Sequence, residues 1–159
     1  MQIGGFMKRV KMLLSALLLA SSIAGHAEEA VSDKEITVYR SPTCSCCGKW
    51  IEHVKQNHFV VKDIISDDMQ AIKQKYGVPG ELASCHTAVV DGYVIEGHVP
   101  AVDIQKLLET KPEVVGISAP GMPMGSPGME MGDRADDFAV VSFDKAGNVK
   151  VFAEHKGGK

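Results

Sequence analysis

The sequence predicts an α/β fold in which the elements follow the order β-α-β-α-β-β-α, with a β-hairpin added at the C-terminus. Three observations support this prediction. Runs of β-branched and aromatic residues have the length of strands, apolar residues recur at helical spacing between them, and an Asp-Gly pair joins two of the runs. Strands that alternate with helices indicate parallel pairing through a crossover helix, which is expected to be right-handed.

The first βαβ unit is predicted from residues 36–39, 46–56 and 59–65. The two outer segments are rich in β-branched and aromatic residues, which favour strands. The middle segment is a predicted helix because its apolar residues recur at the spacing of helical turns. The apolar side of this helix consists of Cys47, Trp50, Ile51 and Val54.

A second helix and a hairpin are expected next. The helix is predicted over residues 67–76, where acidic residues in the first turn suit the positive end of the helix dipole. The apolar runs 87–90 and 93–96 flank Asp91-Gly92. A two-residue Asp-Gly link between such runs is a strong hairpin signal.

The rest of the chain supplies one more helix, a loop and the terminal hairpin. Pro100 is expected to open the third helix. Residues 111–137 are rich in Pro, Gly and Met and show little periodicity, so they are interpreted as a loop. The runs 138–143 and 149–152 are predicted to pair. The order up to the third helix matches the thioredoxin-like plan, and the C-terminal hairpin is an addition to it.

The N-terminus has the features of a secretory signal peptide. A basic start is followed by a mostly apolar run over residues 12–20, which is too short to span a membrane comfortably. Gly25 and Ala27 supply the small residues of a cleavage site. We therefore expect residues 1–27 to be removed by cleavage near Ala27, which leaves a single exported domain over 28–159. The alternative is an uncleaved anchor.

The charge of the mature chain argues against a nucleic-acid partner. Without residues 1–27 the chain keeps 14 basic and 20 acidic residues, a formal net charge of −6. Phosphate binding needs a basic surface instead. The mature chain has no second apolar segment long enough to span a membrane. An exported domain is expected to meet an oxidising compartment.

Three of the four cysteines lie in the stretch SPTCSCCGKW, as Cys44, Cys46 and Cys47. Cys44 and Cys47 alone have a redox C-x-x-C spacing, whereas the third thiol indicates a metal-binding thiolate cluster. The start of a helix stabilises thiolates through its dipole and exposed N–H groups. All three can face one site only if Cys44 precedes the helix. The ordinary alternative is two structural disulfides, although adjacent cysteines pair with each other only under strain.

The fourth cysteine, Cys85, is expected beside the first three. In a thioredoxin-like plan the segment before the third strand lies against the cysteine turn, where thioredoxins carry a cis-proline. This chain has Ser84-Cys85-His86 there. Cys85 read alone would be a small buried apolar residue. Because side chains alternate along a strand, Cys85 and His86 are not both expected to face one site, and His98 is the preferred imidazole ligand.

The other histidines are weaker candidates for metal ligands. His53 and His58 are expected to be solvated, and His155 falls in a polar tail.

The methionines form a second group, because four of them fall in the stretch MPMGSPGMEM. Thioethers are soft ligands that suit Cu(I), so exported Met-rich loops favour copper over zinc. The alternative is a flexible methionine surface that contacts a partner.

The segments CSCCGKW, SCHT, EGHVP and GMPMGSPGMEMG together resemble a bacterial family of exported, thioredoxin-like CxCC metal-binding proteins that includes the copper-resistance protein CopG. The resemblance runs from about residue 36 to residue 152. It implies a periplasmic protein in which cysteine sulfurs bridge more than one Cu(I) ion. By motif, the thiolate ligands would be Cys44, Cys46, Cys47 and Cys85. Further ligands would be His98 and methionines of the loop, with Met122, Met124 and Met129 as candidates.

Three functions remain open from the sequence. The first is copper binding for resistance or homeostasis, with zinc as the rival metal. The second is a thiol or copper oxidoreductase that uses the C-x-x-C spacing. The third is an adaptor whose methionine loop docks on another copper-handling protein or a membrane transporter. No catalytic residues are assigned.

Overall fold

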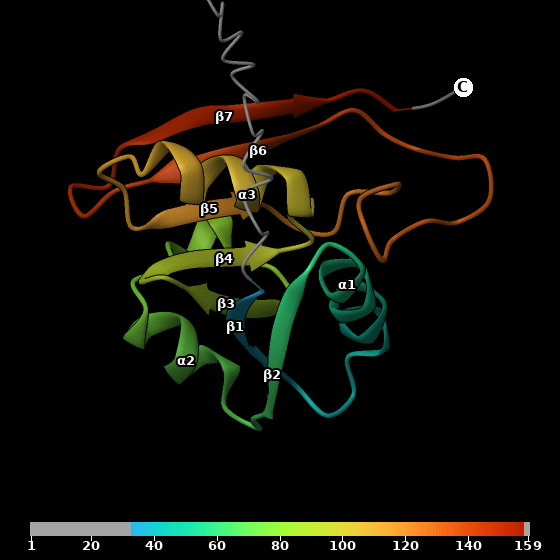
Figure 1. The fold of residues 1–159 in the computed structure, drawn as a ribbon, viewed down its shortest axis with the longest axis horizontal. Helices are drawn as coiled ribbons and strands as arrows, with labels where there is room; N and C mark the ends of the chain where they lie inside the picture. Colours follow the sequence, from blue (N-terminus) through green and yellow to red (C-terminus); the bar gives the residue numbers. More distant parts are fainter. Residues whose placement is uncertain (1–32, 158–159) are drawn as a thin grey trace, which may run out of the picture. The chain divides into compact units, whose positions relative to one another are not determined.

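The structure is a computed structural model, and it describes residues 33–157. The predicted signal peptide over residues 1–27 lies outside the described residues. The described part of the chain forms one mixed seven-stranded sheet with helices, which confirms the predicted α/β class (Figure 1). No helix in this part of the chain is long and apolar enough to cross a bilayer.

The strands lie in the order β2-β1-β3-β4-β5-β6-β7, so β2 and β7 are the edges of the sheet. β1 pairs in parallel with β2, and β4 pairs in parallel with β5. The other neighbouring pairs are antiparallel. The bounds are β1 Lys34–Arg40, β2 Phe59–Ile65, β3 His86–Val90, β4 Tyr93–Gly97, β5 Gly116–Ala119, β6 Phe138–Phe143 and β7 Val149–His155.

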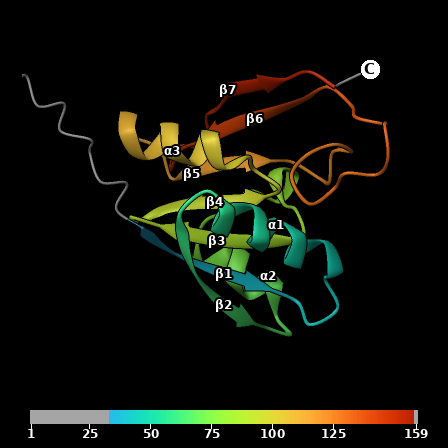
Figure 2. The same ribbon diagram turned by 45° about the vertical axis from the view of Figure 1, so that its right-hand side comes forward.

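Helices cover both faces of the sheet (Figure 2). α1 and α3 pack on one face, where Trp50 and Leu107 are fully buried together with apolar side chains of the central strands. α2 and the 3-10 turn η1 lie on the other face, where Leu82 and Phe143 form a smaller cluster. The bounds are α1 Ser45–Gln56, α2 Met69–Lys75, η1 Gly80–Leu82 and α3 Ala101–Thr110.

The predicted hairpin is confirmed, but one strand was missed. Asp91 and Gly92 link Val90 to its partner Tyr93 with φ values of 47° and 84°, the positive values that a tight two-residue turn requires. The interpretation of residues 111–137 as a loop is wrong at its start, because β5 lies within it. All four residues of β5 are buried, so the strand shows no alternation of apolar and polar residues.

Four segments meet at one end of the sheet. β1, β4 and β5 run in the same direction and β3 runs opposite, so the ends of the first three lie beside the start of the fourth. The cysteine turn follows β1, His98 follows β4, and a long loop follows β5, which we call the methionine loop (residues 120–137). Cys85 directly precedes β3. The topology therefore brings the predicted ligand-bearing segments to one end of the sheet.

Candidate metal centre

Three cysteines lie at the start of α1. Cys44 precedes the helix, as the sequence requires if all three are to face one site, and Cys46 and Cys47 lie in its first turn. Cys44 and Cys47 form a disulfide, with their Cα atoms 5.5 Å apart. Cys46 is a free thiol whose Sγ lies 3.6 Å from the Sγ of Cys44. The alternative of two structural disulfides is wrong, because Cys46 and Cys85 are both free.

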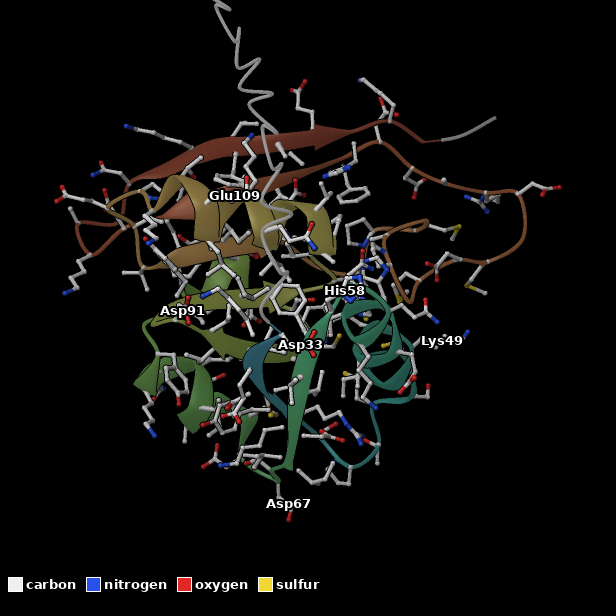
Figure 3. The ribbon with its side chains drawn as sticks, viewed as in Figure 1. Asp33, Lys49, His58, Asp67, Asp91 and Glu109 are labelled. Carbon is white, nitrogen blue, oxygen red and sulfur yellow. A yellow bond between two sulfur atoms is a disulfide. The ribbon has the colours of Figure 1, made fainter. Side chains whose placement is uncertain are left out.

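Cys85 brings the fourth sulfur to the same place. Its Sγ lies 3.9 Å from that of Cys46, and the four sulfurs are all within 4.8 Å of one another. Two sulfurs bound to one metal at about 2.3 Å each, in tetrahedral geometry, would be separated by roughly 3.8 Å. The distances from the Cys46 sulfur to those of Cys44 and Cys85 therefore suit ligands that share metal ions. Figure 3 shows sulfur atoms beside α1 and others on the methionine loop.

Two imidazoles contact the sulfur of Cys85. The Nε2 of His98 lies 3.0 Å from this sulfur, and the Nδ1 of His86 lies 3.4 Å from it. His86 and His98 are both fully buried, with their ring centroids 5.0 Å apart. The ring of His86 also packs on Trp50 at a centroid distance of 4.3 Å. Cys85, His86 and His98 thus form a second group of donor atoms that lie within 4.8 Å of one another.

The methionine loop fixes the orientation of His98. The Nδ1 of His98 lies 2.8 Å from the carbonyl oxygen of Pro127. Because a carbonyl only accepts hydrogen bonds, Nδ1 carries the proton, and the neutral ring directs the lone pair of Nε2 at Cys85. Gly128 permits this approach. It has φ +86°, and a Cβ there would lie 2.8 Å from the backbone nitrogen of Trp50 and 3.3 Å from Nδ1 of His98.

A buried ionic network holds the segment before Cys85. The Oε1 of Glu96 accepts hydrogen bonds from the backbone N–H of Ser84 at 2.6 Å and from Nζ of Lys73 at 2.5 Å. Its Oε2 accepts from the hydroxyl of Thr87 at 2.7 Å. Burial raises the pKa of Glu96, and Lys73 opposes that shift. Ser84 also donates its hydroxyl to the carbonyl of Gly121, which ties the start of the methionine loop to the same point.

Burial sets the protonation of the three grouped side chains. It raises the pKa of the Cys85 thiol to about 12, and the neighbouring Cys46 adds to the shift. It lowers the pKa of His98, and it lowers the pKa of His86 well below the ordinary value. Both rings are therefore neutral near pH 7, the form in which imidazole binds metals. Without a metal, Cys85 stays protonated and donates to His98.

The structure places the candidate methionines less closely than the cysteines. Met122 is 56% exposed, whereas Met124 and Met129 are partly buried. Met129 donates its backbone N–H to Ser126 and accepts at its carbonyl from Gly125, so the loop is internally ordered beside His98. The methionine loop thus reaches the site through its backbone at Pro127, and its thioether ligands remain predictions.

Sequence reasoning misjudged three histidines. His86 contacts the Cys85 sulfur because Cys85 lies before β3, where strand alternation does not apply. His53 is half-buried, not solvated, and accepts from the backbone N–H of Ala101 at 3.0 Å. His155 belongs to β7, where its Nε2 lies 2.6 Å from Asp103. His58 is exposed as expected. No pattern in the sequence marks these contacts, which arise only from tertiary packing.

The arrangement defines a thiol-rich site on an α/β scaffold that can bind soft metal ions or exchange a disulfide. Two solved structures are similar to this chain, both described as the copper resistance protein CopG. Form 2 is 48% identical with a TM-score of 0.75, over 78% of this chain and 99% of that chain. Form 1 is 49% identical with a TM-score of 0.75, over 79% of this chain and 100% of that chain. The chain therefore belongs to the family of CopG copper resistance proteins.

The other comparisons add one family match. A family described as "Protein of unknown function, DUF411" matches residues 82–129, which include Cys85, His86, His98 and the candidate methionines. No curated protein matches this chain. The matched segment begins after the CxCC turn, so it covers the β3, β4 and methionine-loop side of the site.

Proposed function

We propose that this chain is a periplasmic copper-binding protein that holds more than one Cu(I) ion through cysteine sulfurs for copper resistance or homeostasis. The observation that carries this proposal is the convergence of four cysteine sulfurs within 4.8 Å of one another. Thiolates are soft ligands that prefer Cu(I), and a thiolate can bridge two ions. The names of the two similar structures also support a copper-related function.

The thiolates of Cys44, Cys46, Cys47 and Cys85 would bind the ions, with His98 as an imidazole ligand. The residues fit soft metal ions, because sulfur donors dominate the site and the neutral His98 ring directs Nε2 into it. Met122, Met124 and Met129 are candidate thioether ligands on the methionine loop. Export through the signal peptide over residues 1–27 would place the protein in the periplasm.

Copper loading requires a change of redox state. The Cys44–Cys47 disulfide must accept two electrons and two protons from a thiol reductant, which is itself oxidised to a disulfide. Each thiol then loses its proton as Cu(I) binds to the sulfur. Full copper capacity is therefore a property of the reduced protein.

An anaerobic Cu(I) titration of the fully reduced protein tests the proposal. We expect more than one copper per chain by metal analysis, and we expect Cys46→Ser and Cys85→Ser to lower that number. His58→Asn is a matched surface control, because His58 is exposed. A stoichiometry of one copper or less per chain that is unaffected by Cys46→Ser would exclude a multinuclear Cu(I) cluster.

A thiol or copper oxidoreductase is the second candidate, and the disulfide at the C-x-x-C spacing favours it. The free thiol of Cys46 lies 3.6 Å from the Cys44 sulfur, within reach for thiol-disulfide exchange. Insulin reduction or copper reduction by the metal-free protein measures this activity. Turnover that disappears in Cys44→Ser would support it, and an inactive wild-type protein would exclude it.

A further inference from the structure

We propose that Cys85, His86 and His98 form a second, mononuclear binding arrangement for one borderline divalent ion that does not oxidise thiols, such as Zn(II), and that this arrangement stays available while the Cys44–Cys47 disulfide is closed. This site shares Cys85 and His98 with the proposed Cu(I) cluster but does not depend on it. The three donor atoms lie within 4.8 Å of one another, and none belongs to the disulfide.

The distances suit one ion between the three side chains. Sulfur and nitrogen ligands of a tetrahedral ion at about 2.0–2.3 Å would be separated by roughly 3.5 Å. The Cys85 sulfur lies 3.4 Å from Nδ1 of His86 and 3.0 Å from Nε2 of His98. An ion therefore requires only a small opening of the contact between Cys85 and His98.

His98 is already oriented as a metal ligand. Its Nδ1–H donates to the carbonyl of Pro127 at 2.8 Å, which leaves Nε2 as the lone-pair nitrogen. A metal-binding histidine commonly has this hydrogen bond from its other nitrogen to a carbonyl or carboxylate, because the bond fixes the tautomer and the direction of the ring. The contact comes from the methionine loop and does not involve the cysteine turn.

His86 supplies the third donor atom. The ring is fully buried, and its Nε2 has no hydrogen-bond partner among the described residues. Packing on Trp50 holds Nδ1 at 3.4 Å from the Cys85 sulfur, so Nδ1 is the nitrogen that would bind the ion, with the proton on Nε2.

The ligand chemistry differs from that of the reduced site. Closing the disulfide removes two of the four sulfurs, whereas it leaves one thiol and two imidazoles beside each other. Two nitrogens and one thiolate are a borderline set that suits a divalent ion with an open fourth position. Binding transfers no electrons: the Cys85 S–H bond breaks, a metal–sulfur bond forms, and one proton leaves to solvent.

The experiment uses the disulfide-closed protein with Cys46→Ser, so that Cys85 is its one free thiol. Zn(II) is the probe because it does not oxidise thiols, and Co(II) reports tetrahedral thiolate binding by its absorption. We expect one Zn(II) per chain by equilibrium dialysis and metal analysis. His98→Gln and His86→Gln should each raise the Kd by about 100-fold or more. His58→Asn should leave it unchanged.

A second measurement does not depend on the folding of the histidine variants. In the Cys46→Ser protein with both histidines present, Zn(II) should protect Cys85 from alkylation by at least tenfold. Absence of stoichiometric Zn(II) binding, absence of this protection, or binding that ignores His86 and His98 would overturn the inference. The Cu(I) count of the reduced wild-type protein tests the cluster separately, so the two proposals can fail independently.

Discussion

The two cysteine-bearing segments of the site differ in how firmly the fold holds them. Ahead of the hydrogen bonds within α1 itself, the turn is closed by the N–H of Cys44, which donates to the carbonyl of Ser41, and its N-cap residue lacks a side-chain cap. The segment at Cys85 is held by Glu96 through Ser84 and by buried imidazole contacts. We therefore infer that the cysteines at the start of α1 rearrange with redox state, whereas Cys85 and the two histidines beside it keep their positions.

The largest expected effect comes from removing the buried ion pair that holds the segment before Cys85. Lys73→Met removes the cation beside Glu96, whose side chain is fully buried, so an unpaired carboxylate remains in the interior. We expect the free energy of unfolding to fall by about 3–5 kcal/mol in urea titrations. Lys75→Met on the exposed side of α2 is the matched control and should change it by less than about 0.5 kcal/mol. If the two substitutions lowered the free energy of unfolding equally, the Lys73–Glu96 ion pair would not stabilise the fold.

A smaller effect is expected where the methionine loop meets His98. Gly128→Ala would force a Cβ against the backbone of Trp50 and displace the carbonyl of Pro127 from Nδ1 of His98. We expect Cu(I) affinity of the reduced protein to fall by about 10–100-fold in competition with a chromophoric chelator.

Gly132→Ala is the control for this substitution. Gly132 also has a positive φ, +64°, but a Cβ there meets no atom within 4 Å. Backbone strain is therefore matched, and only the contact with the site differs. If both variants bind Cu(I) with the same affinity, the loop does not support His98.

The smallest predicted effect concerns the reactivity of Cys85 in the closed, metal-free protein. Because burial raises the pKa of this thiol to about 12, the thiolate form is scarce near pH 8 and increases with each pH unit above it. Alkylation of Cys85, followed by mass spectrometry, should be at least about tenfold slower than in the urea-unfolded chain at pH 8. It should still accelerate above pH 9. A rate that levels off at the same pH in both states would contradict the buried environment.

Sequence reasoning predicted the elements that show periodicity and failed where burial removes it. The apolar side of α1 and the Asp91-Gly92 hairpin were predicted correctly, because spacing and turn chemistry are local. β5 was missed because its four residues are all buried and give no alternation. The convergence of Cys85 on the cysteine turn followed from the order of the elements and is confirmed by the distance to Cys46.

The histidines mark the limit of prediction from sequence. The role of His86 depends on where β3 begins, since Cys85 just outside the strand escapes the alternation rule. The tautomer of His98 depends on the carbonyl of Pro127, a contact across 29 residues. Such features depend on tertiary contacts that no local pattern encodes.

The most direct test of the central claim compares the Cu(I) capacity of the same protein before and after reduction of the Cys44–Cys47 disulfide. Anaerobic titration and metal analysis of both forms would measure this capacity. The account predicts more than one copper per chain in the reduced form and at most one in the disulfide-closed form, because the closed form lacks two of the four sulfurs. The same capacity in both forms would contradict it.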